Sequence, residues 1–283
     1  MSGYRAKTSE KIAMAFIWSG GVVTMLILVV IIGWVLIRGI PEISLDFLTT
    51  PPQGGLSGEG GISSTVVSTL YLVGITMVIL IPIGTGAAVY LAEYAPDNRL
   101  TRLIRYGVEV LAGVPSILFG LFGFALFVTV LHFTFSILSG ALTLVCLLLP
   151  TMIRTTEEAV KSVPYSHREA ALALGATRWQ TIYRVVLPTA LPGIVTAIIL
   201  CIGRAIGETA CLYVTMGGGA AMPSSIFDGG RTLSLHVFYL AMETRAFEKA
   251  MATAAVLIIT IIVINAVTNW LSHRFQARMR GAI

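Results

Sequence analysis

The chain has 283 residues, of which 56% are hydrophobic and only 12% are charged. Soluble domains carry about 25% charged residues, so this composition excludes an ordinary soluble domain and indicates an integral membrane protein. The net charge of +5 is compatible with a nucleic-acid partner, but basic loops on one side of a membrane account for it more simply.

Apolar runs long enough to cross a bilayer recur along the chain, since a helix needs about 20 apolar residues to span the hydrocarbon core. The first run follows a polar segment at 1–12 and is too long for the core of a signal peptide, so we interpret it as a membrane helix. We predict an all-α polytopic membrane protein with six transmembrane helices at about 13–37, 64–92, 107–131, 135–153, 191–214 and 250–271.

The basic residues predict the orientation of these spans. Most of the 19 Lys and Arg residues fall in segment 1–12, in the second and fourth connections and in the C-terminal tail. Because cytoplasmic loops carry the excess of Lys and Arg, both termini and these two connections should be cytoplasmic. The segment at 38–63, with the glycine-rich stretch PPQGGLSGEGG, should then be a periplasmic loop.

The third predicted span contains the stretch GVPSILFGLFG, which places Pro115 near the start of the helix. Proline removes a backbone donor and clashes with the preceding turn. Broken backbone at membrane depth survives only where protein or a water-filled cavity satisfies it, so the stretch could line a pathway. An ordinary kink, with glycines for close helix packing, is the equal alternative.

Two charged residues, Arg204 and Glu208, lie in the otherwise apolar fifth span. Their spacing of four residues would place them on one face of a helix. A charge at the centre of a membrane helix costs about 2.5–3.5 kcal/mol on insertion scales, so such residues face the bundle interior, pair, or mark an ion route. A structural ion pair and a substrate pathway are both open at this point.

Other polar residues carry less information. Glu109 is either a helix-end charge, which we favour, or a pathway partner, and Arg231 should be an exposed loop residue. The stretch TLSLHVFYLAME at 232–243 has helical apolar spacing and predicts a short interfacial helix. Scattered histidines indicate no metal site, and we interpret the three cysteines as small buried hydrophobes: Cys146, Cys201 and Cys211.

The long connection at 154–190 carries signals for a first short helix. Ser166 and Glu169 have the spacing of a capping box, which predicts a helix that starts at His167. Gly175 is well placed to end that helix in a left-handed conformation.

A second short helix should follow in the same connection. Thr177 and Gln180 offer another capping box, and Pro188 should end the helix. The pair of amphipathic helices could be a connector that lies on the bilayer or a docking element for a soluble partner. The residue pattern alone leaves these two interpretations about equal.

The stretch EAALALGATRWQTIYRVVLP resembles the EAA loop of ABC importer permeases, which favours the docking interpretation. In that family the loop docks into a cytoplasmic ATP-binding subunit and couples its closure to opening of the membrane path. The chain has no Walker A sequence, so the resemblance implies a transporter subunit rather than an enzyme. ATP and Mg would be used by the partner ATPase, with no cofactor bound by this chain. The residues that match the motif are Glu169, Ala170, Ala171, Gly175, Leu187 and Pro188.

The stretches AVYLAEYAP, LAGVPSILFGLFG and GRAIGETA together resemble the membrane subunits of bacterial phosphate ABC importers, the PstA-like subunit in particular. Cys211 stands where a proline often follows GETA in that family. The resemblance implies a type I importer, or MetI-like, permease fold over 64–283. It also implies three kinds of partner: a PstC-like permease subunit, two copies of a PstB-like ATP-binding subunit, and a periplasmic or lipid-anchored phosphate-binding protein.

This resemblance gives Arg204 and Glu208 a specific role. A guanidinium suits phosphate because its donors form a planar fork, so Arg204 would attract the dianion in the path. Glu208 would hold Arg204 and accept a hydrogen bond from the protonated phosphate oxygen. Alternatives are a permease for another oxyanion, such as molybdate or sulfate, a stand-alone secondary anion transporter, and a membrane-embedded enzyme. The secondary transporter would leave the docking loop without a task, and the enzyme would need clustered catalytic residues, of which the sequence offers none besides the Arg204 and Glu208 pair.

Overall fold

A computed structural model describes residues 2–53 and 58–280. Across these two ranges the chain is helical, and its only β-type pairing consists of two isolated bridges. The same residues contain five helices that are long and apolar enough to cross a membrane, or six if one bent pair is counted as a single span. The predicted all-α membrane architecture is therefore confirmed.

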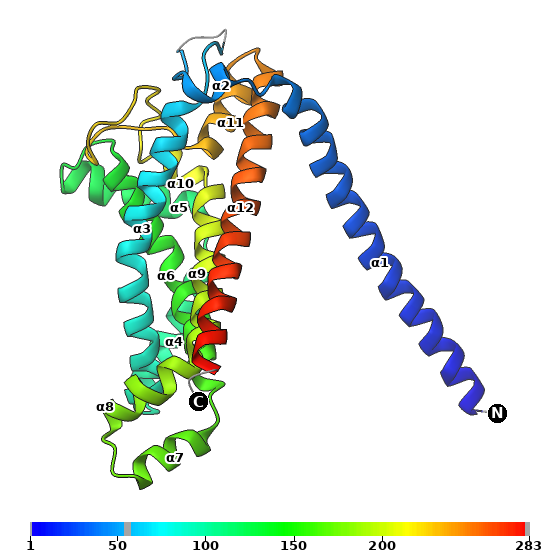
Figure 1. The fold of residues 1–283 in the computed structure, drawn as a ribbon, viewed down its shortest axis with the longest axis vertical. Helices are drawn as coiled ribbons and strands as arrows, with labels where there is room; N and C mark the ends of the chain where they lie inside the picture. The colour runs from blue at the N-terminus through cyan, green and yellow to red at the C-terminus, as the bar shows by residue number, and fades with distance from the viewer. Residues whose placement is uncertain (1, 54–57, 281–283) are drawn as a thin grey trace.

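The first helix, α1 (Ser2–Gly39), runs away from the other helices over most of its length (Figure 1). None of its apolar stretch is buried within the chain. Its end returns to the bundle at Gly39, which lies directly against Met251 and Ala255. The short helices η1 (Ile40–Glu42) and α2 (Leu45–Thr49) follow it.

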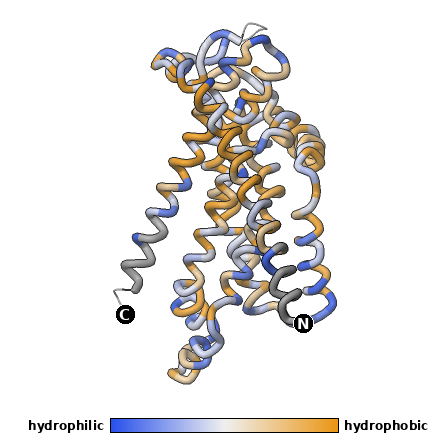
Figure 2. The backbone as a smooth tube through the Cα atoms, turned by 90° about the vertical axis from the view of Figure 1, so that its right-hand side faces the viewer, coloured by the Kyte–Doolittle hydropathy of each residue, from blue (hydrophilic) through white to orange (hydrophobic). Residues whose placement is uncertain are grey.

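The centre of the bundle is α6 (Ile137–Lys161), which packs between α3 (Ser63–Val89) and α9 (Leu187–Gly207). The side chains of Leu144 and Leu148 on α6 are completely buried there. The last helix, α12 (Phe247–Arg280), packs against α9 and α1. Hydrophobic residues fill the middle of the bundle and hydrophilic residues gather at its two ends (Figure 2).

The third predicted span, 107–131, is wrong as a single helix. The chain instead forms α4 (Arg99–Ala112) and then α5 (Ser116–Gly123), which continues as the π-helical turn η3 (Phe124–Val130). The two parts meet at an angle of 103°. Pro115 caps the start of α5 in an extended conformation, and a proline also disfavours helical backbone in the residue before it.

The helices α7 (Tyr165–Ala173) and α8 (Arg178–Thr181) lie together at one end of the bundle, which we call the loop end (Figure 1). The start of α1 and the end of α12 point to this same end. The π-helical turn η4 (Ile182–Val186) joins α8 to α9 without a break, so one helical segment runs from Arg178 to Gly207.

Two further helices lie towards the opposite, or far, end of the bundle. They are α10 (Ala210–Tyr213) and α11 (Leu233–Glu243). The predicted helix at 232–243 is confirmed as α11, but its apolar side packs on α12 and α3, so Leu233, Leu235 and Leu240 are buried by protein. It is therefore part of the bundle rather than a separate surface element.

The other predicted boundaries shift in an informative way. Segment 154–161 is the last part of α6, so the helix is longer than the predicted span 135–153 and the connection is correspondingly shorter. The fifth span is predicted at 191–214. The corresponding helical segment is Arg178–Gly207, so it begins and ends earlier than predicted. The second predicted span, 64–92, agrees with α3 and its π-helical extension η2 (Tyr90–Tyr94).

Candidate functional site

The corner between α7 and α8 is built by local hydrogen bonds. Gly175 has a φ of +84°, in the left-handed region. The Ala176 N–H donates to the Ala171 carbonyl over 3.1 Å, and the Gly175 N–H donates to the Leu172 carbonyl over 3.0 Å. This pair of bonds is the Schellman motif, which satisfies the last carbonyls of a helix. The predicted role of Gly175 is confirmed.

The start of α8 also forms as its residues predict. The Thr177 hydroxyl accepts the Gln180 N–H, and the Gln180 side chain accepts the Thr177 N–H over 2.9 Å. The capping box predicted for Ser166 and Glu169 is wrong, because Pro164 caps α7 and the helix begins at Tyr165. Ser166 therefore lies inside the first turn.

Pro188 does not end the second helix of the connection. It stands in the first turn of α9, directly after η4, where the Leu187 N–H bonds to the Ile182 carbonyl. A proline in a helix lacks an N–H and clashes with the carbonyl four residues earlier. The wider π-helical turn relieves this conflict, so the helix continues through the proline.

The surface of α7 and α8 exposes large apolar side chains. Leu174 at the corner is 90% exposed, and Trp179 and Tyr183 are each 63% exposed. The two aromatic rings stack with their centroids 6.2 Å apart. Exposed apolar residues of this kind occur on surfaces that contact a protein partner or the membrane. The motif residues Glu169 and Ala170 are exposed on the same element.

The remaining motif residues hold this element in place. Ala171 is the buried residue of α7, and Gly175 makes the corner. Leu187 and Pro188 are half-buried at the junction of η4 and α9. Glu169 and Ala170 therefore lie on the exposed surface. The other four motif residues shape the segment from α7 to the start of α9.

Arg204 and Glu208 do not share a helix face. The helix α9 ends at Gly207, and Glu208 has an extended conformation with φ −71° and ψ 136°. Among the described residues, neither side chain forms an ion pair with the other; the Glu208 carboxylate accepts the Thr209 N–H over 3.3 Å instead. The expected geometry is wrong because the helix stops between the two residues.

The break after Gly207 is fixed from the far end of the bundle. The Ser234 hydroxyl at the start of α11 donates to the Glu208 carbonyl over 2.6 Å. Arg204 is exposed, while its neighbours Cys201 and Ala205 are buried in the core. The guanidinium thus points away from this chain's own core, and Glu208 is half-buried beside it on the break.

The segment GVPSILFGLFG meets the chain where GRAIGETA ends, because α5 packs on α10, which begins at Ala210. A Cβ atom on Gly120 would lie 2.8 Å from the Cys211 Cα. Glycine at position 120 is therefore what permits the close approach of the two segments. Cys211 and Cys201 are buried and free, as their apolar setting predicts, and Cys146 is half-buried and free.

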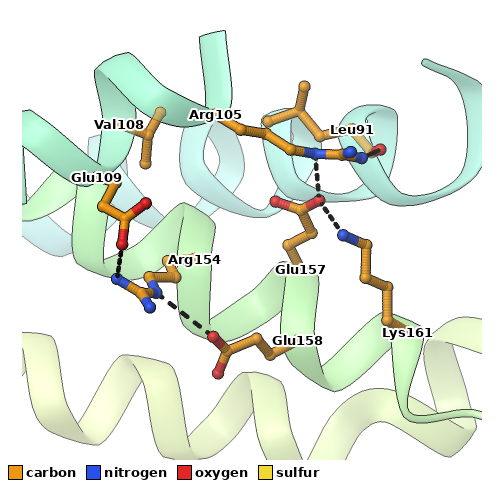
Figure 3. A pocket seen from close by; sticks show the side chains of 8 residues that line it. All are labelled: Leu91, Arg105, Val108, Glu109, Arg154, Glu157, Glu158 and Lys161. Carbon is orange, nitrogen blue, oxygen red and sulfur yellow. Dashed lines mark hydrogen bonds and ion pairs between the residues drawn. The ribbon is translucent and has the colours of Figure 1, made fainter. Parts of the chain in front are cut away.

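A group of charged residues lies between α4 and the last part of α6 (Figure 3), and this part of α6 leads to α7 at the loop end. Glu157 is nearly buried, and its carboxylate forms ion pairs with Arg105 at 2.9 Å and with Lys161 at 2.6 Å. Arg105 also donates to the Leu91 carbonyl over 2.7 Å. These contacts connect η2, α4 and α6.

Glu109 belongs to the same group. It faces Arg154 at 3.6 Å, and Arg154 also faces Glu158 at 3.4 Å (Figure 3). The acidic and basic side chains of the group balance one another. Glu109 is therefore paired at a helix end, as favoured from the sequence, and the group joins helices rather than attracting an anion.

Arg231 differs from expectation, because it is only 8% exposed. Its Nε donates to the Gly218 carbonyl over 2.9 Å, and its guanidinium lies 3.8 Å from the centre of the Tyr239 ring. Nη1 is 3.3 Å from His236 Nδ1. Burial, and then the neighbouring Arg231 charge, lower the pKa of His236 to about 3. This cluster ties the loop before α11 to that helix.

No chemical feature of the sequence singles out Glu93, although it lies in the stretch AVYLAEYAP. In the structure the Glu93 carboxylate forms an ion pair with Arg168 of α7, with 2.6 Å between Glu93 Oε1 and Arg168 Nη2. The two residues are 75 positions apart, so no local pattern could have predicted the contact.

The fold and this loop define a membrane subunit of a transport system. The chain belongs to the family described as binding-protein-dependent transport system inner membrane component, which its residues 81–281 match. It is 37% identical to the probable ABC transporter permease protein YqgI of Bacillus subtilis, over 96% of this chain and 98% of that protein. It is 36% identical to the phosphate transport system permease protein PstA 1 of Mycobacterium tuberculosis, over 92% of this chain and 88% of that protein.

Solved structures agree on the fold. The chain superposes on the MetNI methionine ABC transporter with a TM-score of 0.63 and 20% identity, over 75% of this chain and 94% of that one. It superposes on a bacterial alginate ABC transporter with a TM-score of 0.66 and 16% identity, over 94% of this chain and 97% of that one. The chain is therefore a multi-pass membrane protein with a type I, MetI-like permease fold.

Proposed function

We propose that this chain is the permease subunit of an ATP-driven ABC importer that moves inorganic phosphate across the cytoplasmic membrane. Relatives that match most of the chain are named phosphate transport system permease proteins, and they come from several bacteria. The proposal places both termini and the connection between α6 and α9 in the cytoplasm, and the segment 38–63 in the periplasm.

The observation that carries the mechanism is the continuity of α8, η4 and α9. One helical segment of 30 residues begins in the exposed loop-end surface and ends beside Glu208. Such a segment is about 45 Å long, which exceeds the thickness of a hydrocarbon core. A partner that moves α8 therefore moves Arg204 and the helix break directly.

Arg204 is the residue that meets the anion in this proposal. Its exposed guanidinium in an apolar helix needs a polar surface, which a substrate path along a second permease subunit provides. A planar fork of donors fits phosphate oxygens. Glu208, on the adjacent break, accepts a hydrogen bond from the protonated phosphate oxygen and limits how tightly the anion is held, because transport requires release.

The partners follow from the surfaces that the chain leaves uncovered. A PstC-like permease subunit covers Arg204 and completes the path. Two copies of a PstB-like ATP-binding subunit dock below, one of them on Leu174, Trp179 and Tyr183. They use ATP and Mg, and this chain binds no cofactor. A periplasmic or lipid-anchored phosphate-binding protein delivers the substrate at the far end.

Uptake of labelled phosphate at low external phosphate tests the proposal. Cells that lack this gene should lose phosphate uptake and regain it with the wild-type gene. Labelled sulfate and molybdate serve as controls, and neither should change. Unchanged phosphate uptake in the deletion strain, with loss of one of the other anions, would keep the permease but reject phosphate as its cargo.

A further inference from the structure

The helices α7 and α8 have few apolar anchors of their own. Ala171 is the buried residue of α7, and Thr181 is the buried residue of α8. Helices in proteins owe most of their stability to packing of an apolar face. Polar contacts must therefore help to set where α7 and its corner with α8 sit relative to the bundle, while α8 is also held by its continuity with α9.

The strongest of those contacts meet at Glu93. Arg168 of α7 reaches one Glu93 carboxylate oxygen with both Nε, at 3.1 Å, and Nη2, at 2.6 Å. The two side chains are only 13% and 12% exposed, so solvent screens the pair weakly. Arg168 also donates to the Val160 carbonyl in the last turn of α6 and to the Val163 carbonyl just after that helix.

The second helix contacts the same place. Arg178, in the first turn of α8, donates to the Glu93 carbonyl over 3.2 Å. Its guanidinium also lies over the Tyr94 ring, 5.8 Å from the centre. Both α7 and α8 thus contact the dipeptide Glu93–Tyr94.

That dipeptide continues α3 through η2, and α3 reaches the far end of the bundle. There the Thr69 hydroxyl accepts the Leu233 N–H over 3.0 Å, and the Ser64 hydroxyl donates to the Ala220 carbonyl over 2.7 Å. The helix α3 therefore connects the loop end to α11 and to the loop before it. It forms a second mechanical link, separate from the one through α9.

We propose that Glu93 is a positioning residue that couples α7 and α8 to α3, so that movement of the docked loop reaches the far end of the bundle. This inference rests on the proposed importer function. Glu93 touches no substrate in it and acts through Arg168. Its loss leaves an assembled transporter in which ATP hydrolysis and transport are poorly coupled.

The test uses the complete transporter in proteoliposomes, with its second permease subunit, ATPase and binding protein. Glu93→Gln, Arg168→Gln and the double variant are compared with Glu93→Asp, which keeps the charge. Asp97→Asn is the matched control, since Asp97 faces Arg102 at 3.8 Å but both side chains are exposed. The amount of assembled complex, ATP hydrolysis and phosphate moved per ATP are measured.

Glu93→Gln should assemble and hydrolyse ATP while phosphate moved per ATP falls about tenfold, the size of change that mutations in coupling networks produce. Glu93→Asp should recover part of that loss, and Asp97→Asn should match the wild type. The double variant should be no worse than Arg168→Gln alone, because the two residues act as one unit.

An unchanged ratio of phosphate to ATP in Glu93→Gln would overturn the inference. So would loss of the complex in proportion to the loss of transport, since that is the signature of a purely structural role. If the wild type moved no phosphate, the proposed function would fail separately. The inference would then be judged from stimulation of ATP hydrolysis by the complex's own loaded binding protein.

Discussion

Gly120 of α5 and Cys211 of α10 touch through their backbones. A Cβ atom on Gly120 would lie 2.8 Å from the Cys211 Cα and 3.1 Å from the Cys211 carbonyl oxygen. The contact joins the segment after the 103° bend to the segment after the break at Glu208. The two irregular parts of the chain thus support each other.

Gly120→Ala should destabilise the protein by about 1–3 kcal/mol, because the added methyl group meets backbone that cannot move aside. Gly107→Ala is the control, since Gly107 is also helical and no atom lies within 4 Å of a Cβ built there. That substitution should be neutral or stabilising, as alanine is the better helix former. Thermal unfolding in detergent measures both, and equal melting temperatures would contradict the close contact.

Substitutions at Gly175 should follow the cost of a positive φ and not the size of the side chain. No atom lies within 4 Å of a Cβ built there, so space is not limiting. Asparagine tolerates this conformation best, alanine costs about 1–2 kcal/mol, and a β-branched residue costs more.

Binding of the ATPase subunit to membranes that contain Gly175→Asn, Gly175→Ala or Gly175→Val provides the measurement. Binding should weaken in that order, because the corner between α7 and α8 becomes harder to form. Equal binding by all three variants would mean that the corner is not part of the docking surface.

Arg204→Gln should abolish phosphate uptake while the transporter still assembles, because the Arg204 side chain is exposed and lies outside this chain's core. Arg204→Lys should retain part of the uptake, since it keeps the charge but loses the planar fork. Glu208→Gln should assemble normally, because the side chain's hydrogen bond to the Thr209 N–H needs only an oxygen.

These variants are scored by labelled-phosphate uptake against the amount of purified complex. Loss of the complex in Arg204→Gln would assign that residue to subunit packing instead of the path. Wild-type uptake in Arg204→Gln would show that Arg204 is needed neither in the substrate path nor in subunit packing.

Acid should destabilise the far end of the bundle through His236. Its pKa is lowered from 6.5 to about 3, so the folded protein keeps the imidazole neutral while the unfolded chain binds a proton below pH 6.5. The stabilising contribution is therefore complete above pH 6.5 and is lost as the pH falls towards 3. The cause is burial, together with Arg231 at 3.3 Å.

Melting temperatures of the wild type and His236→Gln between pH 7.5 and about 4 provide the test of this linkage. The wild type should lose stability faster than the variant on acidification. Parallel curves would show that the imidazole titrates in the folded state at its ordinary pH. Arg231→Lys is informative beside them, because it keeps the charge and loses the stacking on Tyr239.

Features set by distant contacts could not be predicted from the sequence, whereas several features set by neighbouring residues could. The capping box expected at Ser166 and Glu169 is an exception, because α7 begins earlier. The Gly175 corner and the Thr177 capping box depend on bonds within a few positions, and both form. Pro188 was expected to end a helix, but η4 absorbs its conflict with the preceding turn. No residue pattern in the sequence predicts a π-helical turn at this place.

The same distinction holds in the candidate site. The charges of Arg204 and Glu208 stand out in an apolar stretch, yet their separation by a helix end depends on Ser234, which is 26 positions from Glu208. Glu93 could not be found at all, because its importance comes from Arg168 and Arg178. Charge and hydropathy locate the site, and tertiary contacts arrange it.

The unbroken segment from α8 to α9 makes this region sensitive to chain length. An α-helix advances about 100° per residue, so deletion or insertion of one residue in η4 would rotate everything beyond it by that angle. Arg204 would then leave the surface that it occupies, while Cys201 and Ala205 would leave the core. Point substitutions on the exposed side of this segment can be absorbed, but a change of one residue in its length cannot.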